Sequence, residues 1–116
     1  MERHWQGLKS VKAFRYHILL ALAGDALHGA EIRRRVQDES QGEVTLYPAM
    51  LYGALDDLAG AGLITEVEPR DPAPDRVRWR FYGLTARGRE TLEAETARLE
   101  AIVGRAREAL GSTAGS

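Results

Sequence analysis

The sequence contains no cysteine, which excludes disulfide bonds, zinc sites made of thiolates and a cysteine nucleophile. It also lacks a long hydrophobic run, because the longest one, residues 18–23, is far shorter than the roughly 20 residues of a membrane-spanning helix. The first residues have no apolar stretch of the kind found in secretory signals. We therefore expect a cytoplasmic protein without a membrane partner.

Neither sign of charge is in large excess. The 116 residues are 44% hydrophobic and 28% charged, which suits one soluble globular domain. Sixteen basic and seventeen acidic residues give a net charge of −1, so no overall basic charge indicates nucleic acid. The charges are uneven, however: residues 44–64 contain no Lys or Arg, whereas residues 76–80 contain three Arg. An anionic partner would therefore be held mainly outside residues 44–64.

Recognisable catalytic motifs are missing as well. The sequence has no glycine-rich phosphate loop, no Ser-His-Asp set within a supporting motif and no carboxylate pair in an apolar setting. His4, His17 and His28 do not have the spacing of metal ligands, and we expect His28 to cap or hydrogen-bond at a helix start. We therefore expect neither an enzyme nor a cofactor or metal site.

Three segments have apolar residues at helical spacing: residues 8–23, 28–38 and 47–61. Gly24, Gly42 and Gly62 follow them as stop signals, and Pro48 suits a first helical turn because its missing N–H costs nothing there. The buried face of the third helix is predicted from Leu51, Leu55 and Leu58. Short helices with short links are typical of a helix-turn-helix.

The hydrophobic period changes between residues 63 and 84. Residues 63–69 predict a strand, a proline-rich turn follows, and residues 76–84 alternate strictly. The alternation places Val77, Trp79 and Phe81 on a buried face, and Arg76, Arg78, Arg80 and Tyr82 on the other. The sequence therefore predicts a mainly α fold with a two-stranded β-hairpin wing (α+β), that is, a winged helix-turn-helix over residues 8–84.

The last segment predicts one long helix over residues 85–110, with Thr85 as its N-cap. Its apolar stripe consists of Leu92, Leu99, Ile102, Val103 and Leu110. A helix of this length cannot pack entirely on a domain whose core already uses three helices, so we predict a symmetric homodimer through it. The alternative is a helix that folds back over its own domain. Residues 1–7 and 111–116 are expected to be flexible ends.

Several segments, taken in order, resemble the PadR-like transcriptional regulators. They are ILLAL (18–22), LHGAEI (27–32), LYPAMLYGAL (46–55), DLAGAGLI (57–64) and RFYGLTARGR (80–89). No single segment is specific to this family, but the combination of the five segments is. The resemblance implies a dimeric winged-helix repressor of the short subtype with a single C-terminal helix, which binds a palindromic operator in double-stranded DNA. Members often respond to small molecules, so an effector, unidentified here, is implied too.

The sequence departs from the family pattern at three places. Ala30 replaces an aromatic residue, Met50 stands where many relatives have a small hydroxyl residue, and Asp56-Asp57 replaces residues that are commonly basic. The acidic pair leaves open how strongly this helix contacts DNA.

The second helix of a helix-turn-helix enters the major groove with its N-terminal residues near the base edges. The predicted DNA-binding residues at and just before the start of that helix are Thr45, Tyr47, Ala49, Met50, Tyr52 and Gly53, of which Thr45 and Tyr47 can bond phosphates. Arg34, Arg76, Arg78 and Arg80 are predicted as further phosphate contacts. For Tyr52 the alternative is packing between helices. For the arginines it is a solvated surface, partly neutralised by Glu66 and Glu68 in the wing.

A second function stays open: a winged helix that serves as a protein-interaction or dimerisation module without specific DNA binding. Residues 86–110 contain no aromatic side chain, so we predict no tight site for planar drugs between the C-terminal helices. Regulation by an effector is expected to be either absent or located elsewhere, for example near Trp5.

Overall fold

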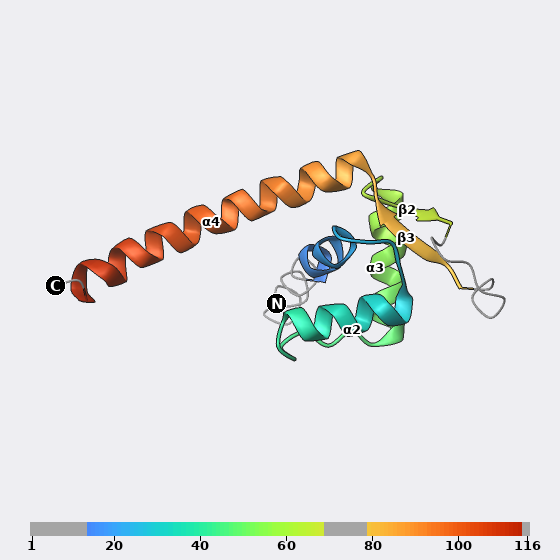
Figure 1. Cartoon of the computed structure of the whole chain (residues 1–116), viewed down its shortest axis with the longest axis horizontal. Helices are drawn as coiled ribbons and strands as arrows, with labels where there is room; N and C mark the ends of the chain where they lie inside the picture. Colours follow the sequence, from blue (N-terminus) through green and yellow to red (C-terminus); the bar gives the residue numbers. More distant parts are fainter. Residues whose placement is uncertain (1–13, 69–78, 115–116) are drawn as a thin grey trace, which may run out of the picture.

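A computed structural model describes residues 14–68 and 79–114 of the chain, and Figure 1 shows their arrangement. In chain order the elements are helical residues 14–22, β1 (Leu27–His28), α2 (Gly29–Glu39), α3 (Pro48–Gly60), β2 (Ile64–Val67), β3 (Phe81–Leu84) and α4 (Ala86–Ala114). Helices and a small antiparallel sheet form a winged helix-turn-helix, so the predicted fold class is confirmed.

Local signals explain where the helices begin and end. Pro48 occupies the first turn of α3, and the chain leaves that helix through Gly62 at φ 79°, a left-handed conformation that suits glycine. Beyond α2 the chain turns through Gln41 at φ 55° and Gly42 at φ 82°. The predicted helices at residues 28–38 and 47–61 are therefore confirmed, within about two residues at each end.

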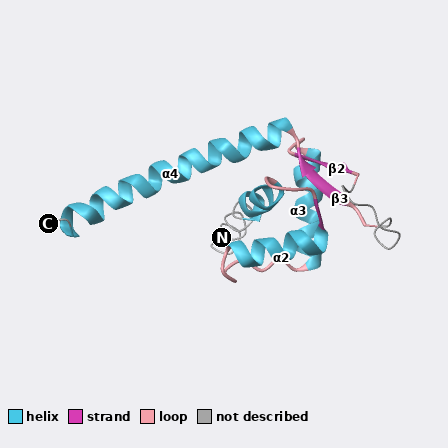
Figure 2. Cartoon of the chain, viewed as in Figure 1, coloured by secondary structure: helices cyan, strands magenta, loops and turns pink. Residues whose placement is uncertain are grey.

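The sheet differs from the predicted two-stranded hairpin. Its order is β1-β3-β2, and both outer strands run antiparallel to β3, which lies in the centre (Figure 2). β1 consists of Leu27 and His28, which pair with Tyr82 and Phe81. The wing is thus hydrogen-bonded to the residues that lead into α2.

The core lies between the first three helices and the sheet, and the start of α4 covers part of it. Its largest fully buried side chains are Ile18, Leu19, Ile32, Val36, Leu46, Leu51, Leu55, Leu58 and Ile64. They include the three leucines predicted as the buried face of α3. At about 25 cal/mol per Å² of apolar surface removed from water, such burial is the main force that holds these short helices together.

The predicted faces of the last wing strand are wrong. Phe81 and Tyr82 are both buried, because Tyr82 joins the core and Phe81 packs edge-on against the ring of His28. Trp79, expected in the core, lies before β3 begins and is 44% exposed. Strict alternation fails because both faces of this central strand are covered.

The structure caps α4 as the sequence predicts, but the helix continues to Ala114 and does not end at residue 110. The Thr85 hydroxyl accepts a hydrogen bond from the Gly88 N–H at 2.9 Å and donates one to the Gly62 carbonyl at 2.6 Å. This side chain therefore ties the start of α4 to the turn that ends α3. Residues 111–114, which were expected to belong to the flexible end, are helical in the structure.

Within residues 14–68 and 79–114, no helix is long and apolar enough to cross a membrane. The same residues contain no cluster of three or more His, Asp or Glu side chains placed to hold a metal ion.

Candidate nucleic-acid interface

The connection between α2 and α3 is held by side-chain hydrogen bonds. Arg33 Nε donates to the Leu46 carbonyl at 2.8 Å, which fastens the segment before α3 to α2. The Ser40 hydroxyl accepts from the Val44 N–H at 3.0 Å and closes the turn after α2. Together with the buried leucines of α3, these bonds fix which face of α3 meets solvent.

The exposed face of α3 and the residues just before it carry the predicted DNA-binding residues of this segment. Tyr47 is the N-cap residue, with extended backbone, and Pro48 follows in the first turn. Thr45, Tyr47, Ala49, Met50, Tyr52 and Gly53 are all exposed. We call these six residues the α3 surface. The structure therefore brings the predicted contacts of this helix together, although their role in DNA binding stays a prediction.

Tyr52 meets α2 at one edge and solvent at the other. A Cβ added at Gly29 would lie 3.4 Å from the Tyr52 hydroxyl oxygen, so the ring packs beside the first residue of α2. The side chain nevertheless remains 57% exposed. The ring thus has a packing role and is still open to a partner.

His28 joins the wing to the start of α2. Its backbone N–H donates to Glu31 Oε1 at 3.1 Å, so the prediction that it hydrogen-bonds at the start of this helix is confirmed. Its ring also contacts two aromatic rings, those of Trp79 at 4.5 Å and Phe81 at 5.3 Å between centroids. The sequence gives no signal for the contact with Trp79, since the two residues are far apart in the chain and share no periodic pattern.

A hollow of about 640 Å³ lies where α2, α3 and the wing meet. Its lining residues are His28, Gly29, Ala30, Tyr52, Asp56, Trp79, Arg80 and Tyr82. The lining combines aromatic rings with one guanidinium and one carboxylate, and the α3 surface continues from it through Tyr52.

The charged residues considered for DNA contact differ in their position relative to this hollow. Arg80 lines it, Arg34 is exposed on α2 without lining it, and Arg76 and Arg78 lie outside the described residues. Asp56 and Asp57 are exposed on α3. Among the described residues, Arg34 and Arg80 form no ion pair.

The predicted dimerisation residues on α4 fall into two groups. Leu92, predicted as a dimerisation residue, is 7% exposed and belongs to the core of its own chain. Further along, Leu99 is half-buried, whereas Ile102, Val103 and Leu110 are exposed, the last at 70%. Figure 1 shows why: α4 runs away from the globular part of the chain.

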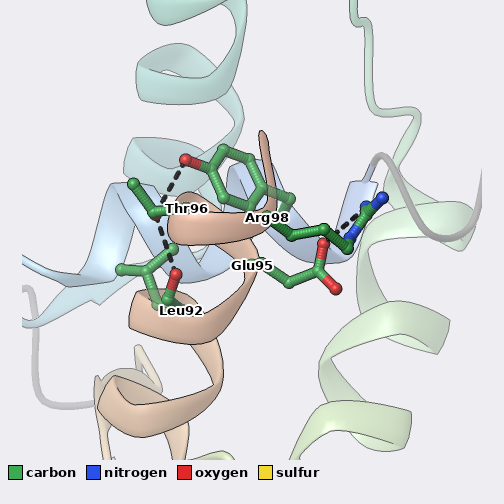
Figure 3. Close-up of polar contacts among 5 residues, drawn as sticks. Leu92, Glu95, Thr96 and Arg98 are labelled. Atoms are coloured by element: carbon green, nitrogen blue, oxygen red, sulfur yellow. Dashed lines mark hydrogen bonds and ion pairs between the residues drawn. The ribbon is translucent and has the colours of Figure 1, made fainter. Parts of the chain in front are cut away.

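A groove of about 760 Å³ lies between the first helix and α4. Tyr16 and His17 line it on one side, Glu95 and Leu99 on the other. Thr96 closes one part of the contact: its hydroxyl bonds the Tyr16 hydroxyl at 3.1 Å and the Leu92 carbonyl at 2.8 Å (Figure 3).

An exposed ion pair lies at the same groove. Arg98 donates to Glu95 Oε2 at 2.8 Å (Figure 3), and this hydrogen bond raises the pKa of the Arg98 guanidinium. The Arg98 guanidinium, which is charged at every physiological pH, lines the groove together with Leu99.

The arrangement of α2, α3 and the wing is that of a winged helix-turn-helix protein. The family model for the transcriptional regulator PadR-like family matches residues 18–94, more than half of the 116 residues. The chain belongs to this family. Its members are transcriptional regulators rather than enzymes, in agreement with the sequence prediction.

Solved structures agree in fold. A PadR family regulator from Clostridium difficile is 23% identical with a TM-score of 0.69, over 84% of this chain and 98% of that one. A PadR-like transcription factor from Bacteroides fragilis is 19% identical with a TM-score of 0.72, over 90% and 97%. Bacillus subtilis PadR, solved with operator DNA, is 23% identical with a TM-score of 0.61, over 72% of this chain and 47% of PadR. No curated protein matches the chain.

Proposed function

We propose that this chain is a DNA-binding transcriptional repressor that acts as a homodimer on a palindromic operator. The observation that carries the proposal is the α3 surface: the start of the second helix of the motif is exposed, while Leu51, Leu55 and Leu58 anchor the opposite side. In this motif the N-terminal residues of that helix reach the base edges of the major groove.

Phosphate contacts come from the residues around that surface. Arg80 at the base of the wing and Arg34 on α2 are exposed cations without an ion pair in the described part of the chain. The predicted contacts Arg76 and Arg78 precede Arg80 in sequence. Contacts of this kind position a protein on DNA and make its affinity fall as salt rises. The Bacillus subtilis relative, which was solved with operator DNA, supports the same role for this chain.

The dimer follows from the exposed apolar residues of α4. Ile102, Val103 and Leu110 lie where no described part of the same chain covers them. A second copy of α4 packed against them removes this apolar surface from water, and the groove beside Tyr16 and Leu99 adds to the surface that it meets. Two-fold symmetry of the protein then matches two-fold symmetry of the operator.

The test is binding to the DNA that flanks the protein's own gene, measured by fluorescence anisotropy over a range of salt concentrations. We expect the logarithm of affinity to fall linearly with the logarithm of salt concentration, and Arg80→Ala to reduce the slope by about one. Glu100→Gln, a change of charge on an exposed position of α4, is the matched control and should leave the slope unchanged. A reporter gene placed behind the same DNA should be expressed less when the protein is present.

One observation favours the alternative, an interaction module that does not bind DNA specifically. The α3 helix carries two exposed acids, Asp56 and Asp57, together with exposed Tyr47, Met50 and Tyr52. A surface of this kind also suits a protein partner. Absence of DNA binding at every salt concentration would favour this alternative.

A further inference from the structure

The α3 surface is unusual in the hydrogen-bonding groups that it lacks. Residues 44–64 contain no Lys, Arg, Asn, Gln or His. Arg and Lys make the paired hydrogen bonds that identify guanine in the major groove, and Asn and Gln make those that identify adenine. None of these contacts is available to α3.

The polar atoms that remain are few. Thr45, Tyr47 and Tyr52 offer hydroxyl groups, each with one O–H donor and an acceptor on the same oxygen, and such a group does not distinguish bases as a bidentate pair does. Asp56 and Asp57 offer carboxylates, which accept hydrogen bonds but repel phosphates. Donor-based recognition of purines by this helix is therefore weak.

Apolar groups occupy the first turn in their place. Met50 is 40% exposed and does not belong to the core, and Ala49 beside it is exposed as well. The major groove presents a single apolar group at its base edges, the C5-methyl of thymine. An exposed thioether chain and a methyl side chain at the leading end of a recognition helix match this group in chemistry.

We infer that α3 reads thymine C5-methyl groups in the operator through Ala49 and Met50. This inference rests on the proposed function, because it names the bases that the same helix recognises. Each half-site has thymines opposite the first turn of α3, and their methyl groups are buried on binding. Specificity at these positions comes from apolar contact and not from hydrogen bonds.

The experiment selects high-affinity sequences from a pool of randomised DNA duplexes with the full chain, then replaces each thymine of a selected duplex by deoxyuridine, one at a time. Deoxyuridine lacks only the C5-methyl. Burial of one such group is worth about fourfold in affinity, so we expect one or two positions in each half-site to weaken binding about fourfold. Replacing guanines by 7-deazaguanine in the same half-site should weaken binding less.

Variants of the protein show which residue contacts the methyl group whose removal weakens binding. With Met50→Ala, the affinity ratio between the thymine and deoxyuridine duplexes should fall toward one at the position that Met50 contacts. Arg34→Ala is the control: it should weaken both duplexes by the same factor and leave the ratio near fourfold.

The outcomes separate the inference from the proposed function. Sequence-specific binding without any deoxyuridine effect, or with a larger effect of 7-deazaguanine, overturns the thymine readout and leaves the DNA-binding regulator standing. A pool that yields no enriched sequence overturns both.

Discussion

Gly53 is a residue that the fold does not require. It lies in the middle of α3, its φ is not in the left-handed region, and a Cβ added there would have no atom within 4 Å. A glycine within a helix costs about 0.5–1 kcal/mol relative to alanine. The cost is explained if the backbone of α3 comes close to DNA at this point.

We therefore expect Gly53→Leu to raise the free energy of unfolding by up to about 1 kcal/mol and to abolish specific DNA binding. The stability gain comes from helix propensity, and the loss of binding comes from exclusion of the larger side chain from the groove. Urea denaturation measures the first and duplex anisotropy the second.

Gly60→Ala is the control, because Gly60 is also exposed with no atom within 4 Å of an added Cβ, but ends the helix. This variant should keep its affinity for DNA. If Gly53→Leu binds DNA like the parent chain, the middle of α3 does not approach the groove.

The contact between His28 and Trp79 makes a second prediction at this scale. Trp79→Ala removes the ring that packs on the residue before α2 and leaves the β1–β3 pairing in place. Since Trp79 is 44% exposed, we expect a loss of only about 1 kcal/mol in stability. The DNA affinity should fall further than this, because the base of the wing is no longer held beside α3. Equal affinity of the variant and the parent would show that this ring contact does not position the wing.

One hydroxyl group bridges the turn after α3 and the start of α4. Thr85 caps α4 through the Gly88 N–H and also bonds the Gly62 carbonyl. Thr85→Ala leaves both partners without this bond, so we expect a loss of about 1–2 kcal/mol in the free energy of unfolding. Thr85→Ser keeps the hydroxyl and should recover most of the loss. Urea denaturation of the two variants checks the prediction, and equal stability of Ala and Ser would contradict it.

Substitutions in the outer half of α4 test whether the chain forms a dimer through this helix. Ile102→Asp combined with Val103→Asp changes two exposed side chains, so the fold of the single chain should be unaffected. In the proposed dimer the same charges would be buried at a cost of several kcal/mol, and we expect a monomer by light scattering. Circular dichroism provides the control for folding. A monomer measured for the unmodified chain at micromolar concentration would contradict the dimer itself.

The sequence predicts the elements with strong periodic or capping signals. The leucines of α3, Pro48 and Thr85 specify where two helices begin, and the structure agrees. β1 could not be predicted, because two residues have no period and their partners in β3 lie more than 50 positions away. The faces of the wing strand were predicted wrongly, since the presence of β1 makes β3 a central strand with both sides covered.

The candidate site, like the fold, could be predicted from the sequence only in part. Exposure of Tyr47, Met50 and Tyr52 follows from the helical period once Leu51 and Leu55 are assigned to the core. The hollow bordered by Trp79 could not be predicted, because it depends on how the wing lies against α2. Local spacing does not contain that information.

At the scale of the whole molecule, the side chains of α4 affect whether a planar ligand can bind between two copies of this helix. Residues 86–114 contain no aromatic side chain, and the hydroxyl of Tyr16 in the neighbouring groove bonds Thr96. Stacking of a planar ligand on an aromatic face contributes about 1 kcal/mol, and α4 does not offer it. We expect planar dyes to show no submicromolar binding at the seam between two copies of α4, as measured by dye polarisation. Tight binding that is lost in Leu99→Trp and kept in Trp5→Leu would contradict this.

The Thr85 hydroxyl, which bonds the turn after α3 to the start of α4, also marks the point about which α4 can turn. α4 has 29 residues and is therefore about 43 Å long. A rotation of about 5° at the Thr85 junction displaces the far end of such a rod by about 4 Å, close to the rise of one base pair. In a dimer joined through α4, the rod acts as a lever whose pivot lies at the end of the reading helix. A small angular change at this pivot therefore tilts α3 relative to the rod, while the distance between the two pivots, which the joined rods set, stays the same.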